Sequence, residues 1–542
     1  MLCFIILTMT NKTLKGGENM LRLIATITIF VSTAYAQIVW MDYTSTGCVT
    51  CHKIASVKMS DTLYIFGTFH YKDTTMNPFL IAVDSSLNVK WYKAFSHSLP
   101  NLAIDKMVKV NDSLIAVSGG HSFYAGQCPN KQCTFFGIFN IKTQNFVWAK
   151  YRQTSIYGDH LSATAIDFDG NNLVIGAQGT QSYLGSWLLK VGLNGNILWQ
   201  KAIYRANKPD LWVMDVIFDG ANYVYLFRNA DSENVSLVKF DLNGNLKWAK
   251  DYNFGKFEYP YKLLRDADGY VVVGFKCHSV NCSSLDSIDN ILIFKTDTAG
   301  NISWSKLYSS NIPGWRRKYR AYNIALDYDG NYLVSGFVRA TSTSSYPIVL
   351  KINRNNGNLI WARYWDVPPL NTNSNRGAGV ISIGQGKFYL LTFIGSGTDA
   401  SRGFAIIRDD TARADGGCTK SLSMSVSSQN PVVSNLNVTI INASYPVNNL
   451  SLSSYNPNIN QVSSCEITPI SNYEYIKSCD YEIRPQRNYI EISLKRKKNV
   501  YIYNVVGKVV YRDEFEGKRR IKLKDGIYVI KLDNEKFKVV VK

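Results

Sequence analysis

One short phrase recurs along this chain of 542 residues and limits what the chain can fold into. In its clearest copy, residues 240–250, two runs of alternating apolar and polar residues flank the pair Asn243-Gly244. Both central residues of a tight hairpin turn need a positive φ, and Asn-Gly adopts that conformation with the least strain. The phrase therefore predicts a β-hairpin whose second strand carries a tryptophan.

The phrase repeats with a period of about 50 residues, within the range of repeat architectures. Each repeat reads as four short strands without helical periodicity, which is typical of a β-propeller blade. In every copy Lys or Arg follows two positions after the tryptophan. These tryptophans are Trp91, Trp148, Trp199, Trp248, Trp304 and Trp361.

The two ends of the repeat region complement each other. The last unit, residues 374–415, has three predicted strands and no tryptophan strand, while residues 38–43 form a lone copy of that strand around Trp40. A sheet built from both ends would close a ring and remove exposed edges. We predict an all-β chain, with a seven-bladed β-propeller closed by an N-terminal strand and then a small C-terminal β-sandwich. A β-solenoid or two sandwiches is the alternative.

Composition divides the chain into four parts. Residues 1–36 read as a signal peptide that starts at Met20, with an apolar stretch at 24–31 and a small-residue cleavage site at 34–36. Residues 37–415 hold the predicted propeller. Residues 416–478 are rich in Ser and Asn and are interpreted as a linker, and 479–542 hold a second β module.

The C-terminal module carries three ordered sequence blocks. They are residues 500–510, residues 526–531 and the basic-apolar end at 538–542. In this order they resemble the type A sorting domain of bacterial type IX secretion. The resemblance implies passage across the outer membrane after Sec export, contact with the type IX machinery, and a secreted or cell-surface protein. Its motif residues are Gly507, Lys508, Gly526, Tyr528 and Lys542.

Ligand binding is expected on one face of the propeller. The Asp-Gly and Asn-Gly turns make one face plain, whereas the longer connections make the opposite face elaborated, and variable loops commonly bind ligands. Aromatic and basic residues there can stack on sugars or clamp anions. We expect a monomeric binding protein rather than an enzyme, with a glycan or protein ligand and no nucleic acid. The candidates are Trp212, Trp315, Arg316, Arg317, Tyr319, Trp365 and His160.

The cysteines support two interpretations. Disulfides are permitted in an exported protein, and we expect no cofactor and no metal site. Cys48, Cys51 and His52 also match the Cys-x-x-Cys-His pattern of c-type haem attachment, which makes a haem protein the alternative; a disulfide involving Cys48 is the simpler explanation. The disulfide candidates are Cys128, Cys133, Cys277, Cys282, Cys418 and Cys465.

Two enzymatic alternatives stay open at this point. A glycan-active enzyme would need carboxylates that converge on the central channel of the propeller. Residues 357–361, Gly-Asn-Leu-Ile-Trp, also resemble the tryptophan phrase of quinoprotein propellers, but the chain lacks the adjacent cysteine pair of the dehydrogenases in that family. Quinone-dependent oxidation is therefore the weaker alternative.

Overall fold

The structure is a computed structural model. It describes residues 37–42, 55–72, 75–99, 102–120, 132–154, 163–177, 185–205, 211–229, 234–255, 257–278, 289–310, 312–313, 315, 318–341, 344–366, 377–396, 400–410, 419–457, 460–462, 476–477, 481–486, 489–504, 509–523, 526–532 and 535–541. Within these ranges all regular structure is β-strand, and no helix is long and apolar enough to cross a membrane.

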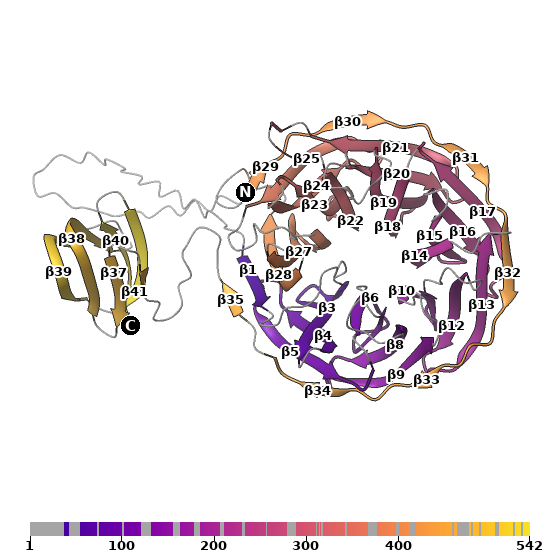
Figure 1. The fold of residues 1–542 in the computed structure, drawn as a ribbon, viewed down its shortest axis with the longest axis horizontal. Helices are drawn as coiled ribbons and strands as arrows, with labels where there is room; N and C mark the ends of the chain where they lie inside the picture. The colour runs from indigo at the N-terminus through magenta and orange to yellow at the C-terminus, as the bar shows by residue number, and fades with distance from the viewer. Residues whose placement is uncertain are drawn as a thin grey trace, which may run out of the picture.

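Seven antiparallel blades surround a central channel (Figure 1). Each blade contains four strands, which follow one another along the chain from the channel outward. Blades one to three contain β2 (Ala55–Ser60), β3 (Leu63–Lys72), β4 (Thr75–Val83), β5 (Val89–Ser96); β6 (Ala103–Lys109), β7 (Leu114–Gly120), β8 (Gln132–Asn140), β9 (Asn145–Thr154); and β10 (Ala163–Phe168), β11 (Asn172–Ala177), β12 (Ser186–Gly192), β13 (Ile197–Arg205).

The next three blades follow the same order. They contain β14 (Leu211–Phe218), β15 (Tyr223–Asn229), β16 (Val235–Phe240), β17 (Leu246–Asn253); β18 (Phe257–Arg265), β19 (Gly269–Cys277), β20 (Asp289–Asp297), β21 (Ile302–Ser309); and β22 (Lys318–Leu326), β23 (Tyr332–Arg339), β24 (Ser345–Ile352), β25 (Leu359–Trp365).

Blade seven joins the two ends of the repeat region. Its strands β26 (Gly377–Gly384), β27 (Lys387–Ser396) and β28 (Ala400–Asp410) are completed by β1 (Gln37–Asp42). β1 pairs with β28 over its whole length, from Gln37 opposite Arg408 to Asp42 opposite Gly403. The predicted closure of a seven-bladed ring by the N-terminal strand is therefore confirmed.

The middle strands of each blade are buried on both faces because neighbouring blades cover them. Every residue of β19 is buried, whereas β17 on the outside of blade four has exposed residues, including Leu246. The apolar residues of adjacent blades pack face to face, as in the cluster that joins Val273 and Ile293 of blade five to Val334 and Leu350 of blade six. The hydrophobic effect thus acts mainly between blades.

The repeated tryptophan and the repeated turn belong to one contact between neighbouring blades. The indole N–H of the tryptophan donates to a turn carbonyl of the next blade. Gly357, with a φ of +70°, lies so close to the Trp304 indole that a Cβ added at this position would be 2.6 Å from the ring. The hydrogen bonds of this kind run from Trp148 to Leu193 (2.7 Å), from Trp199 to Leu242 (3.3 Å) and from Trp304 to Arg354 (3.3 Å).

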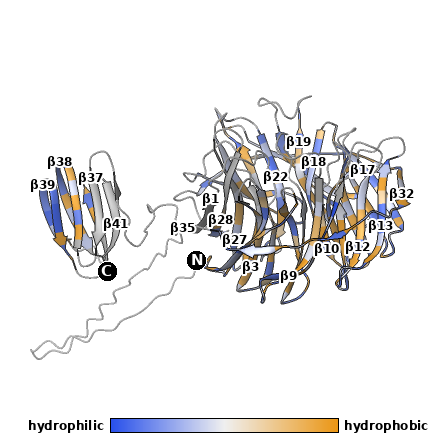
Figure 2. Ribbon diagram, turned by 60° about the horizontal axis from the view of Figure 1, so that its bottom comes forward, coloured by the Kyte–Doolittle hydropathy of each residue, from blue (hydrophilic) through white to orange (hydrophobic). Residues whose placement is uncertain are grey.

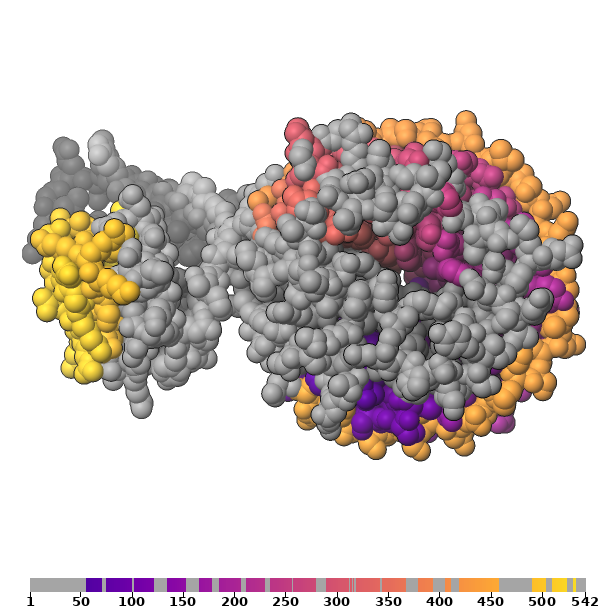
Figure 3. Space-filling view, in the orientation of Figure 1, coloured from indigo at the N-terminus to yellow at the C-terminus, as the bar shows by residue number. Residues whose placement is uncertain are grey.

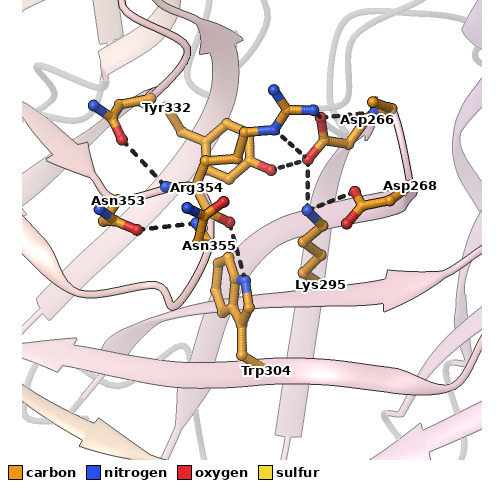
Figure 4. A network of polar contacts seen from close by, with 10 residues as sticks. Asp266, Asp268, Lys295, Trp304, Tyr332, Asn353, Arg354 and Asn355 are labelled. Carbon is orange, nitrogen blue, oxygen red and sulfur yellow. Dashed lines mark hydrogen bonds and ion pairs between the residues drawn. The ribbon is translucent and has the colours of Figure 1, made fainter.

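A polar contact repeats beside it on the plain face. In Figure 4, Asp266 of blade five accepts a hydrogen bond from the Tyr332 hydroxyl of blade six and pairs with Lys295 Nζ at 2.8 Å and with Arg354. The first-to-second strand turns of blades three and four make the same kind of contact. Asp169 accepts from Tyr223 (2.5 Å), and Asp219 accepts from Tyr270 (2.7 Å). The plain-face carboxylates therefore link blades.

The segment interpreted as a linker forms a belt around the propeller. Its strands add a fifth antiparallel strand to the outer edge of every blade, in reverse order from blade six to blade one and then blade seven (Figures 1 and 3). From its composition the segment was interpreted as a loosely structured or small β connector, and its strands pair regularly with the blades. The belt strands are β29 (Thr419–Ser421), β30 (Ser425–Ser428), β31 (Val432–Asn435), β32 (Val438–Asn442), β33 (Asn448–Asn449), β34 (Ser453–Tyr455) and β35 (Asn460–Val462).

The C-terminal module has its own core. Its two long strands pair along their length, with an irregularity between Leu494 and Lys498 that divides them into two halves. Both halves contribute to one apolar cluster, as expected of a β-sandwich, and β39 is hydrophilic over most of its length (Figure 2). The strands are β36 (Ile476–Lys477), β37 (Tyr481–Gln486), β38 (Tyr489–Asn504), β39 (Val509–Lys522), β40 (Gly526–Leu532) and β41 (Glu535–Val541).

Candidate functional site

A cavity of about 290 Å³ lies in the central channel. Residues from the innermost strands of blades one, two, five, six and seven line it. A concave site with a few converging polar groups on an apolar wall is the usual form of a small-molecule site. The polar lining consists of Ser56, Asp105, Lys106, Tyr261, Lys262, Tyr322 and Asn323.

Three of the irregularities in the inner strands lie at this lining. The pairing of β6 with β7 skips Asp105, that of β18 with β19 skips Tyr261, and that of β22 with β23 skips Tyr322. A bulge inserts one unpaired residue and changes the direction of its side chain, and bulges are frequent next to functional sites. All three skipped residues line the cavity. The bulges thus supply one carboxylate and two phenols to the channel.

A buried carboxylate is held by two lysines beside the cavity. Asp215 of blade four has a side chain only 1% exposed, and its oxygens lie 3.3 Å from Lys106 Nζ of blade two and 3.0 Å from Lys262 Nζ of blade five. The backbone N–H of Leu263 also donates to Asp215 at 3.0 Å. Removing one partner of such a cluster would leave an uncompensated buried charge, which is strongly destabilising. The ion pairs therefore hold the inner strands of blades two, four and five together around the channel.

Two aspartates near the channel have opposite pKa shifts. Burial raises the pKa of Asp167 to about 6, although the backbone N–H groups of Phe218 and Phe168 donate to its carboxylate. Burial also opposes ionisation of Asp215, but Lys106 and Lys262 outweigh it and hold the pKa of Asp215 below its usual value. The inner strands therefore place a carboxyl that titrates near neutral pH close to one that stays ionised.

Aromatic rings form the wall beside the cavity. The Tyr261 ring contacts Tyr322 edge-on at 4.4 Å between centroids and stacks with Phe275 at 6.0 Å. Tyr322 stacks in turn with Phe337 at 5.8 Å, and the Arg320 guanidinium lies 4.1 Å from the Phe275 centroid. These contacts hold the two channel tyrosines in place across blades five and six.

Trp212 belongs to a related stack on blade four. The Arg228 guanidinium lies 4.9 Å from the Trp212 centroid and 3.6 Å from that of Tyr259 of blade five. Tyr259 stacks on Phe275 with centroids 4.8 Å apart. The structure therefore connects Trp212, a predicted ligand-binding residue, to the aromatic wall of the channel.

The other described candidates from the sequence pack within the scaffold. Trp315 stacks with Tyr346 at 5.5 Å and contacts Tyr364 edge-on at 5.2 Å. Tyr319 and Trp365 are fully buried, and Trp365 Nε1 donates to Asp409 at 2.8 Å. Neither buried ring presents surface to a dissolved ligand. These two rings therefore belong to the scaffold, while Arg316 and Arg317 of the connection between blades five and six lie outside the described residues.

Several predictions fall outside the described residues. The Cys-x-x-Cys-His pattern lies there, so haem attachment stays an untested alternative, which an absorption spectrum of the purified protein would decide. Cys277 is buried at the end of β19 and is disulfide-bonded; Cys282, with which the Cys-x4-Cys spacing predicts a local disulfide, is among the residues not described. The described residues contain no group of three side chains able to hold a metal. Outside lie His160, Arg316, Arg317, Cys48, Cys51, His52, Cys128, Cys282, Cys418, Cys465, Gly507, Lys508 and Lys542.

The remaining predicted residues are described by their backbone only. Cys133 lies in β8, and the sorting-motif residues Gly526 and Tyr528 lie in β40, where they pair with Val541 and Val539 of β41. The position of the sorting motif in paired strands fits its role as part of a folded module.

The channel residues were not predicted from the sequence, because the candidate residues were chosen from the loops. Asp105, Lys106, Asp215 and Lys262 all lie inside strands that read as ordinary blade strands. The available signal was the charge itself: a charged residue in the first strand of a unit interrupts an otherwise apolar pattern. In a propeller, that strand lines the channel.

Comparison with known proteins identifies the C-terminal module. Residues 484–542 match the family described as the secretion system C-terminal sorting domain. The protein is therefore exported by type IX secretion to the cell surface or the medium, as the sequence resemblance predicted. No curated protein has a significant sequence match to the chain.

Among solved structures, three β-rich chains illustrate the likeness. Sqt1 of Chaetomium thermophilum, bound to the N-terminus of ribosomal protein L10, is 11% identical over 68% of this chain and 98% of its own, with a TM-score of 0.36. A protein of unknown function from Dyadobacter fermentans is 8% identical over 70% and 98%, with a TM-score of 0.36. The polysaccharide lyase Uly1 is 10% identical over 69% and 98%, with a TM-score of 0.37. Likenesses this distant carry no argument about the ligand.

Proposed function

We propose that this exported propeller binds a ligand in its central channel, at Asp105, Tyr261 and Tyr322. The observation that carries the proposal is that Asp105, Tyr261 and Tyr322, each skipped by the pairing of its inner strand, line one cavity. The inner strands of blades three, four and seven have the same kind of bulge, at Thr164, Met214 and Ala378, so the bulge belongs to the blade repeat. The polar side chains that the cavity gathers at three of these bulges, and not the bulges themselves, point to a ligand.

The chemistry of the lining favours a neutral, polyhydroxylated ring such as a carbohydrate. Tyrosine rings offer flat apolar faces with a polar end. The Asp105 carboxylate and the Asn323 amide can accept hydroxyl hydrogens. Lys106 and Lys262 both pair with Asp215, so an anionic ligand would have to compete with this buried carboxylate for either ammonium group.

A glycan array with the purified mature protein tests this proposal. Tyr261→Ala and Asp105→Asn should each weaken the strongest binding signal by about tenfold or more, because each removes a lining group. Tyr328→Ala and Asp61→Asn are matched controls on exposed plain-face turns, since Tyr328 is 57% exposed and the Asp61 side chain 92% exposed. If Trp315→Ala alone abolished binding, the ligand would lie on the blade connection instead.

A second candidate, a glycan-active enzyme, is favoured by one observation. Asp167, with its raised pKa of about 6, and ionised Asp215 lie on neighbouring inner strands. A carboxyl with a raised pKa near an ionised carboxylate is the pattern of general acid catalysis, but neither side chain is among those that line the cavity. Glycan cleavage that is lost in Asp167→Asn, while binding is retained, would support catalysis. Binding of intact glycans without cleavage products would support the binding role.

A further inference from the structure

The belt advances by one blade for every seven residues. Along it, every seventh backbone N–H donates to the carbonyl of the residue that directly follows a blade tryptophan. The five bonds run from Leu422 to Ala362 (2.8 Å), Gln429 to Ser305 (3.1 Å), Leu436 to Ala249 (3.0 Å), Ala443 to Gln200 (3.0 Å) and Leu450 to Ala149 (2.8 Å). One register is thus repeated over five consecutive blades.

The repeat length limits how far apart equivalent points of neighbouring outer strands can be. Seven extended residues span roughly 23 Å at a rise of about 3.3 Å per residue. In blade one, Tyr455 pairs with Ala94. Continued by two residues, this register places Pro457, seven residues after Leu450, opposite Tyr92, the residue that follows Trp91. Proline has no N–H, so Pro457 cannot donate the hydrogen bond that the five earlier positions make. In blade seven the register changes, since Asn460 pairs with Trp40.

Leucines occupy every second one of these positions in the belt. Leu422, Leu436 and Leu450 are at most 8% exposed, and they pack into the cores of different blades. The residue before each of the five seventh positions pairs with the basic residue that follows a tryptophan by two positions. Lys201 Nζ thus donates to Asn442 at 3.4 Å, and Lys306 Nζ to Ser428 at 2.9 Å. The basic residue of the repeated phrase is therefore a belt contact.

One belt residue is anchored by aromatic and cationic contacts. The Arg152 guanidinium lies 3.6 Å from the Tyr445 centroid and 4.9 Å from that of Trp187. Gln200 Nε2 also donates to the Tyr445 carbonyl at 3.2 Å. Tyr445 thus fixes the crossing from blade three to blade two by bonds to both blades.

The belt ends beside the strand that closes the ring. In blade seven the order is β26-β27-β28-β1-β35, so β1 lies between the last propeller strand and the last belt strand. Without the belt, every outer strand would be an open edge, and β1 would pair on one side only. We infer that residues 419–462 form a clasp. This segment pairs with one blade per seven residues over five blades, and it stabilises the closed ring by covering the outer edge of β1.

Hydrogen exchange of the full chain tests the clasp. Leu436→Asp combined with Leu450→Asp should release the belt from blade four onward, because both leucines are buried. Amides of β17, β13, β9 and β1 should then exchange at least about tenfold faster, while the inner strands stay protected. Val432→Asp is the control, since Val432 lies in the belt but is 71% exposed. Unchanged protection of β1 in the double variant would overturn the inference.

A length change gives a second, directional test. Ser444 lies in the crossing between β32 and β33. An inserted glycine after Ser444 can loop out, whereas deletion of Ser444 shifts later residues by one position and turns Leu450 away from the core. Deletion should speed exchange in β9, β5 and β1 but leave β25 and β21 protected, and insertion should change neither group. Equal protection of β9 in both variants and the parent would refute the seven-residue register.

Discussion

The indole Nε1 of Trp148 donates a hydrogen bond to the carbonyl oxygen of Leu193, 2.7 Å away on the next blade. Gly195 of the same turn, with a φ of +84°, lies so close that a Cβ added there would be 3.3 Å from that indole. The turn of one blade therefore packs against the tryptophan of the preceding blade. The recurring sequence phrase encodes a contact between blades as well as a hairpin.

This contact predicts a difference between two glycines of blade six. Gly357→Ala and Gly330→Ala both place alanine at a positive φ, but only Gly357 lies against the Trp304 ring, whereas nothing lies within 4 Å of a Cβ added at Gly330. We expect each substitution to lower the free energy of unfolding by about 1 kcal/mol, and Gly357→Ala by about 1–3 kcal/mol more through overpacking. Urea unfolding measures both, and equal losses would show that the turn does not depend on the indole.

The plain-face network predicts sensitivity to acid. Burial opposes ionisation of Asp266, but Lys295, Tyr332 and Arg354 outweigh it and lower its pKa to about 2. The carboxylate therefore stabilises the fold above pH of about 4, and that contribution is lost as pH falls toward 2. The stability difference between the parent and Asp266→Asn should shrink over this range in urea titrations. A difference that stays constant from pH 5 to pH 2 would contradict the assignment.

Asp167 predicts the opposite dependence on pH. Because its pKa is raised to about 6, the folded protein keeps a proton that the unfolded chain releases near pH 4. Its contribution to stability should decline as pH rises from about 4 to about 6 and then level off. Asp167→Asn should lack this decline, so the two stability curves should diverge over that interval. Parallel curves would show that the Asp167 pKa is not raised.

The sorting module predicts where a truncated protein accumulates. Removal of residues 484–542 deletes the matched sorting domain and leaves the propeller and its belt in the chain. We expect the truncated protein to be absent from the cell surface and the medium and to be retained inside the outer membrane. Fractionation with antibody detection measures this, with an internal propeller substitution such as Tyr328→Ala as the control. Normal surface delivery of the truncated chain would contradict the role of the module.

The ring was predictable because its information is local and repeated. The tryptophan phrase and the tight turns recur in the sequence, and the missing strand of the last unit matches the spare strand around Trp40. These features depend on backbone turn chemistry and strand alternation, which single sequences carry well. The sorting module was predictable for a similar reason, since its motifs are contiguous.

The channel and the belt depend on contacts between distant parts of the chain. Asp215 is defined by Lys106 and Lys262, which are distant from it in the sequence on either side, and no local pattern links them. The belt had a signal, the regular spacing of Leu422, Leu436 and Leu450, but its Ser and Asn content is that of a linker. Trp365 was a candidate for ligand binding but is buried. An aromatic residue at a strand end gives the same sequence pattern whether it is exposed or buried.

Calorimetric titration of the glycan selected by the array tests the central claim that the channel is the binding site. The parent protein and the Tyr328→Ala control should bind with the same Kd, and Tyr261→Ala and Asp105→Asn should each raise the Kd by about tenfold or more. Circular dichroism of each variant should match the parent, which separates lost binding from lost folding. Unchanged affinity in both folded channel variants would contradict the claim.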